Sequence, residues 1–170
     1  MTGRLRRVSR RLALALALAL ALGGCGKADT DAAISEYADA EIVISGLADR
    51  EFAVTPGELA KLDVVSATGV GQSAKAGTVR GAGPTLETFL AQYGRSPDEF
   101  ALARFIASDG YRVTLHEKSL AESEIIMAIT SGGGALPQSE RPMRLIIPGA
   151  ESNRWIYAVE RIEFELRSSE

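Results

Sequence analysis

Short stretches of the chain alternate hydrophobic and polar residues, which is the pattern of strands with one buried face. The clearest lies near the C-terminus, where Ile162, Phe164 and Leu166 alternate with charged residues and are expected to point inward. Other runs are rich in β-branched and apolar residues and end at Gly or Pro. The expected strands are 41–45, 51–55, 63–70, 74–82, 103–108, 111–115, 124–129, 143–147 and 161–167.

Two segments follow a helical pattern instead. Thr55 is a good N-cap residue and Pro56 suits the first helical position, so a short helix reaching Leu62 is expected. A second helix should begin after Gly83 and end near Gly94. Its apolar residues fall at the spacing of one buried helix face. They are Leu86, Phe89, Leu90 and Tyr93.

The dipeptide Asp109-Gly110 predicts a hairpin, because these residues suit the two positive-φ positions of a type I′ turn. A two-residue turn would pair Ile106 with Val113. Successive strand residues point to opposite faces, so the second strand should have two distinct sides. Tyr111, Val113 and Leu115 are expected on one face, and Arg112, Thr114 and His116 on the other.

These elements predict one α+β domain over residues 41–168, strand-rich and mixed. About 130 residues suffice for a core that folds alone. Residues 25–40 are polar and small, and they are interpreted as a flexible tether. The glycine run 131–134 is expected to be a plain hairpin loop, with an anion-binding backbone nest as the alternative.

The N-terminus resembles the signal peptide of a bacterial lipoprotein over residues 1–24. It carries five Arg and no acidic residue, followed by eleven alternating Leu and Ala residues, a run too short to span a bilayer. Leu22-Gly23-Gly24-Cys25 then resembles the lipobox, in which the Cys receives the lipid. The alternatives are a plain signal peptide with a coincidental Cys, or a short buried helix. Ser9-Arg10-Arg11 also resembles a twin-arginine export motif, so the export route is left open.

Charge and cysteine content narrow the possible functions. The chain has 170 residues, a single Cys and a net charge of −3. Removing the basic leader leaves 14 basic and 22 acidic residues, so the acidic body argues against nucleic acid as a partner. The expected location is the extracytoplasmic face of the cell membrane, with the lipid on Cys25 as the anchor.

The order of four motifs resembles the oxidoreductase molybdopterin-binding domain of the sulfite oxidase type. The motifs are Gly83-Pro84-Thr85-Leu86, Ser108-Asp109-Gly110-Tyr111, Arg141-Pro142-Met143-Arg144-Leu145-Ile146-Ile147-Pro148-Gly149 and Asn153-Arg154-Trp155-Ile156. They run in family order across residues 42–166. The resemblance implies the fold of that family and an extracytoplasmic redox enzyme that holds molybdenum through a pterin dithiolene and one Cys thiolate.

The ligand cysteine implied by this resemblance is absent. It should lie within 64–81, where the chain offers only the hydroxyls of residues such as Ser66 and Ser73. A serine hydroxyl is a poorer ligand than a soft thiolate. We therefore expect no metal ligands, no catalytic residues and no bound cofactor, with molybdopterin suggested by resemblance alone.

A phosphate-bearing ligand would still need cationic or polar contacts. The family's phosphate contact is the basic residue beside the Trp, which is Arg154 here. Arginine offers a bidentate fork for oxyanions. The full candidate set is Arg154, Arg144, Arg112, His116 and Asn153. The alternatives are a surface charge for Arg154, an internal ion pair for Arg144, a solvated His116 and a core role for Trp155.

The leading hypothesis is a non-catalytic, lipid-anchored module that binds a small anion or an envelope protein. The second is a molybdopterin-dependent oxidoreductase with a non-Cys metal ligand. The third is an accessory protein of an envelope electron-transfer system.

Overall fold

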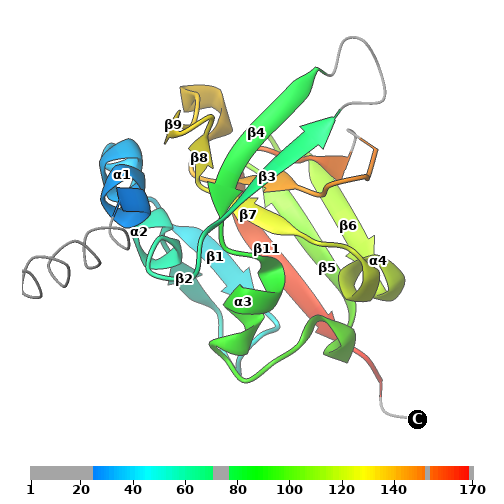
Figure 1. Ribbon diagram of the computed structural model, residues 1–170. Helices are drawn as coiled ribbons and strands as arrows, with labels where there is room; N and C mark the ends of the chain where they lie inside the picture. Colours follow the sequence, from blue (N-terminus) through cyan, green and yellow to red (C-terminus); the bar gives the residue numbers. More distant parts are fainter. Residues whose placement is uncertain (1–24, 71–76, 152–153, 169–170) are drawn as a thin grey trace, which may run out of the picture.

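The computed structural model describes residues 25–70, 77–151 and 154–168. Its largest sheet has five strands in the order β2-β1-β11-β5-β6. Only the β1–β11 pair is parallel, so residues early and late in the chain share the centre of this sheet (Figure 1). The strands are β1 (Ile42–Ser45), β2 (Phe52–Val54), β5 (Phe100–Ala107), β6 (Arg112–His116) and β11 (Val159–Leu166).

Two smaller sheets complete the β structure. A four-stranded sheet has the order β3-β4-β8-β9, and β7 pairs with β10. The strands are β3 (Val65–Val70), β4 (Thr78–Gly83), β7 (Ile126–Ala128), β8 (Thr130–Ser131), β9 (Gly134–Ala135) and β10 (Arg144–Ile146). Gly132 and Gly133, both at positive φ, make the β8–β9 turn, so the glycine run is the expected hairpin loop.

The helices are short and several have recognisable caps. Thr55 and Glu58 form a capping box on α2, and the Thr85 side chain caps α3. Leu86, Phe89 and Leu90 of α3 are buried as expected. The helices are α1 (Cys25–Ile34), α2 (Pro56–Leu59), α3 (Leu86–Ala91) and α4 (Glu117–Glu122), with 3-10 turns η1 (Pro97–Glu99) and η2 (Gln138–Glu140). None of the described helices is long and apolar enough to span a bilayer.

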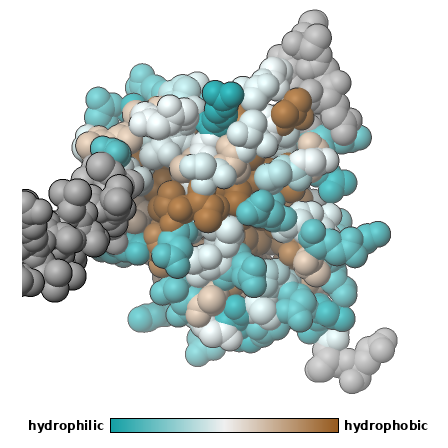
Figure 2. Space-filling model, viewed as in Figure 1, coloured by the Kyte–Doolittle hydropathy of each residue, from teal (hydrophilic) through white to brown (hydrophobic). Residues whose placement is uncertain are grey.

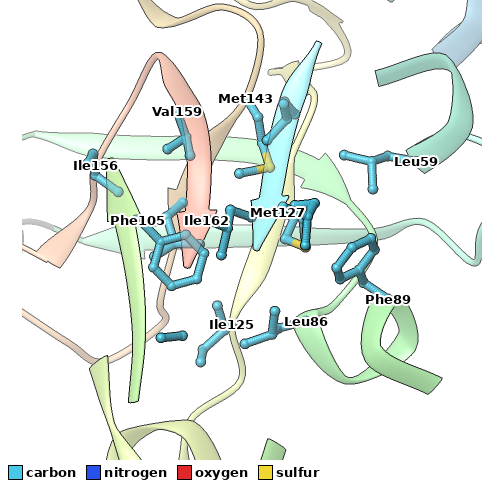
Figure 3. Close-up of a cluster of buried hydrophobic side chains, with 14 of the residues drawn as sticks. Leu59, Leu86, Phe89, Phe105, Ile125, Met127, Met143, Ile156, Val159 and Ile162 are labelled. Carbon is cyan, nitrogen blue, oxygen red and sulfur yellow. The ribbon is translucent and has the colours of Figure 1, made fainter. Parts of the chain in front are cut away.

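The β7–β10 pair is buried on both faces. Met127 and Leu145 belong to the main core, where side chains from several strands and from α2 and α3 converge (Figure 3). Ile126, Ala128 and Ile146 point the other way and pack with Ala67 of β3. This explains why β7 is a continuous apolar run and why β10 exposes no polar residue, its Arg144 being buried.

The hairpin between β5 and β6 differs from the expected one. Val113 pairs with Phe105, not with Ile106, and the Ala107 amide donates to the Tyr111 carbonyl. The loop therefore has three residues and places only Gly110 at positive φ, because a type I turn followed by a left-handed residue also suits the Asp-Gly sequence. The expected faces of β6 hold, although Tyr111, just before the strand, is 52% exposed.

The predicted tether is only partly separate from the domain. Residues 25–34 form α1, and Ile34 and Tyr37 are buried in the core. The polar composition of 25–40 concealed two anchoring side chains. A second correction concerns Leu166, which is 45% exposed because a register shift at Glu165–Leu166 ends the alternation.

Candidate functional site

Trp155 packs as a core residue against the second sheet. It is 6% exposed, and its indole Nε1 donates to the Ile147 carbonyl at 3.1 Å. A Cβ added to Gly69 of β3 would lie 2.8 Å from the indole ring, so the ring rests directly on the β3 backbone. The core role considered for Trp155 is confirmed.

Arg154 lies at the surface beside this tryptophan. Its Nη1 donates to the Ser119 hydroxyl of α4 at 3.3 Å, and its side chain is exposed. Asn153, the other candidate beside the tryptophan, lies outside the described residues. Binding of an anion by Arg154 therefore stays a prediction.

Arg144 forms the internal ion pair that the sequence left open. Its side chain is 8% exposed, and Nη1 lies 2.5 Å from Oε2 of Glu140 in η2. The Nε atom is buried without a hydrogen-bond partner among the described residues. Because the neighbouring carboxylate already balances its charge, Arg144 is a poor receptor for a second anion.

Arg112 and His116 both lie on the exposed face of β6. Four residues along a strand separate them by roughly 13 Å, so they cannot grip one small anion together. His116 also precedes α4 without donating or accepting a side-chain cap hydrogen bond. The structure thus leaves Arg112 and His116 as separate positions.

The donor atoms present do not fit a sulfite oxidase-type molybdenum site. Residues 26–170 contain no Cys. The described residues also contain no group of three His, Cys, Asp or Glu side chains that could hold a metal. Ser66 lies on β3 with an exposed side chain, while Ser73 is outside the described residues. A hydroxyl does not replace a soft thiolate ligand.

A cleft of about 940 Å³ lies elsewhere, between α1 and the four-stranded sheet. Ser66, Ala82 and Thr130 are neighbours across β3, β4 and β8 and form a floor of small side chains. Residues 29–33 of α1 form one wall, and residues 60–64 form the other. Figure 2 shows hydrophobic side chains across the middle of this face, flanked by hydrophilic ones.

The rim of the cleft is polar and carries both signs of charge. Asp29 and Asp63 contribute carboxylates, and Lys61 is the basic residue among the described side chains that line it. Leu62 and Val64 add apolar surface beside them. A small floor with a mixed rim suits a small molecule that has a polar group and an apolar body.

Tyr37 holds the α1 wall in place. Its hydroxyl donates to the Ile129 carbonyl at 2.6 Å and accepts from the Leu136 amide at 3.0 Å. Arg141 lies 4.7 Å from the centre of the Tyr37 ring and pairs with Glu36 at 2.7 Å. Sequence reasoning missed this cleft because its wall belongs to the segment interpreted as a tether; the isolated Ile34 and Tyr37 were the available signal.

Comparison with known proteins identifies the fold. No protein-family model matches the chain, and no curated protein matches it in sequence. The crystal structure of the sulfane dehydrogenase SoxCD from Paracoccus pantotrophus is similar, with a TM-score of 0.63 and 19% identity. The match covers 75% of this chain and 38% of that one, so this chain corresponds to well under half of its length.

This likeness confirms the expected fold class. The chain is a mixed, strand-rich α+β domain with the fold of sulfite oxidase-type molybdoenzymes. At 19% identity, this similarity is evidence for the fold alone.

Proposed function

We propose that this protein is a lipid-anchored, extracytoplasmic binding module that uses a sulfite oxidase-type fold without its redox chemistry. One observation carries the proposal: the chain has a single sulfur nucleophile, and it lies in the lipobox-like Leu22-Gly23-Gly24-Cys25. Residues 64–81, where the resemblance requires the metal ligand, contain none. The same sulfur cannot serve both an anchor and a site in the sheet.

The start of α1 supports the anchor. Cys25 is the first residue of α1, and that helix is joined to the core through Ile34 and Tyr37. A ten-residue helix spans about 15 Å. Lipid on Cys25 would therefore hold the domain close to the membrane surface, with the cleft wall next to the anchor.

Replacement of the anchor residue tests the location. Cys25→Ser should move the protein from the membrane fraction to the soluble fraction and abolish incorporation of labelled fatty acid, because the thiol that takes the lipid is gone. Ser139→Ala, a change at an exposed position on η2, serves as the control for expression. Membrane retention of the Cys25→Ser protein, with no lipid attached, would contradict the proposal.

The ligand is a small anion or a protein segment, and in the cleft the contact for an anion would be Lys61, which shares the rim with Asp29 and Asp63. Lys61 supplies the cation, and the small floor admits the ligand body. In a titration with inorganic phosphate, Lys61→Ala should weaken binding at least several-fold, whereas Lys118→Ala, exposed on α4, should not.

Arg154→Ala belongs in the same titration because it tests the position predicted beside the tryptophan. A loss confined to Arg154→Ala would place the anion there and not in the cleft. Unchanged affinity in both variants would contradict anion binding.

A further inference from the structure

The four-stranded sheet ends in a bare edge. Strand β3 pairs with β4 on one side, and within residues 25–70, 77–151 and 154–168 no strand pairs with its other side (Figure 1). Its six residues, Val-Ser-Ala-Thr-Gly-Val, contain no charged side chain and no proline. Edge strands of natural proteins are usually protected from pairing by Lys, Pro, a bulge or a covering element. No such device lies within β3.

Hydrogen bonds further along the sheet show which β3 groups are free. The carbonyls of Arg80 and Ala82 accept bonds from Gly132 and Ile129, so these two β4 residues face β8. The alternate residues of β4 therefore face β3, and their partners there are Val65, Ala67 and Gly69. The residues between them, Ser66, Thr68 and Val70, turn their backbone N–H and C=O groups outward.

The side chains of these three residues are exposed as well. Ser66, Thr68 and Val70 lie on the face opposite Ala67, and Val70 is 64% exposed. No hydrogen bond to their outward backbone groups comes from any other described residue. The outward backbone N–H and C=O groups of these three residues are therefore available to pair with a second extended strand.

The geometry points to a second copy of this chain as the occupant, bound through antiparallel β3–β3 pairing about a two-fold axis at Thr68. In this register Ser66 faces Val70 of the other copy, and Thr68 faces Thr68. Every outward N–H and C=O then finds a partner. A two-fold interface of this kind is closed, because it consumes the same edge in both molecules.

The charge of β3 permits a second copy to bind there. The chain carries a net negative charge, yet β3 is neutral, so two copies can approach along this strand without direct repulsion. Thr–Thr pairs across antiparallel strands are favourable. Helix α1 packs at β8 and β9, at the other end of the sheet from β3.

Cysteine crosslinking of the full-length protein in its membrane tests this pairing. Hydrogen-bonded antiparallel partners lie with their Cα atoms about 5.5 Å apart, a distance that a disulfide spans. Thr68→Cys should give a crosslinked dimer on mild oxidation. Thr114→Cys, exposed on the edge strand β6, is the matched control and should stay monomeric. The unmodified protein shows whether Cys25 itself crosslinks.

Sedimentation of the detergent-solubilised protein gives a second measurement. The unmodified protein should sediment as a dimer, and Thr68→Lys, which sets two ammonium groups against each other at the axis, as a folded monomer. Crosslinking of Thr68→Cys no stronger than that of Thr114→Cys would overturn the inference. Sedimentation of the unmodified protein as a monomer would also overturn the inference. The same holds if a segment of another protein, and not a second copy, occupies the β3 edge.

Discussion

Tyr37 shows how one side chain joins the N-terminal segment to the core. Its hydroxyl bridges the Ile129 carbonyl and the Leu136 amide, and both bonds are buried. Replacement by Phe keeps the ring but leaves a buried acceptor and a buried donor unpaired. Such a loss costs about 1–3 kcal/mol.

Tyr37→Phe should therefore lower the free energy of unfolding by about 2 kcal/mol in denaturant titrations. Tyr157→Phe, at a side chain that is 51% exposed, is the control and should change it by less than about 0.5 kcal/mol. Equal stability of the two variants would show that the Tyr37 bridge does not hold the N-terminal segment.

The same residue predicts a pH dependence. Burial raises the pKa of Tyr37 above its ordinary value of 10.0, although the Leu136 hydrogen bond and the nearby Arg141 oppose the rise. As pH rises, the unfolded chain therefore loses the Tyr37 phenolic proton before the folded protein does. The contribution of protonated Tyr37 to the free energy of unfolding is complete below pH 10 and is lost as pH rises through the folded pKa. In Tyr37→Phe, the alkaline fall in stability should be smaller; an unchanged fall would assign it to other groups.

At the scale of elements, contact between Trp155 and β3 ties the loop after β10 to the second sheet. Gly69 is required there because a Cβ would meet the indole at 2.8 Å. Gly134 in β9 offers a matched site, since a Cβ there meets only one atom, at 3.8 Å. Neither glycine has a positive φ, so the comparison isolates packing.

Gly69→Ala should destabilise the protein by roughly 1–3 kcal/mol through overpacking. Gly134→Ala should stay within about 0.5 kcal/mol of the unmodified protein in the same unfolding titration. If Gly69→Ala leaves the free energy of unfolding unchanged, Trp155 can shift to make room for the methyl group, and its ring is not fixed on β3.

Most elements could be predicted because their signals are local. Alternation, Gly-Pro boundaries and the capping residues Thr55 and Thr85 lie within a few positions of the element that each defines. The hairpin register was wrong because Asp-Gly fits two turn types. The cleft could not be predicted, since it depends on α1 meeting β8 and β9, a contact between segments about 100 positions apart.

At the scale of the whole molecule, the chain combines a fold similar to that of SoxCD with a sole Cys at position 25. The fold of sulfite oxidase-type enzymes is shown by the likeness to SoxCD. The proposal of a membrane-anchored binding module depends on the chemistry of the donors, because residues 64–81 contain no Cys to supply the thiolate that molybdenum requires, and a hydroxyl is a poorer ligand. Membrane attachment and ligand binding follow as separate tests.

The most direct test is the metal content of the full-length protein, purified from cells that synthesise the molybdenum cofactor. We expect molybdenum far below one atom per chain, and no Mo(V) resonance, because no thiolate is present to hold it. A protein containing close to one molybdenum per chain, with a Mo(V) signal that responds to turnover, would contradict the account.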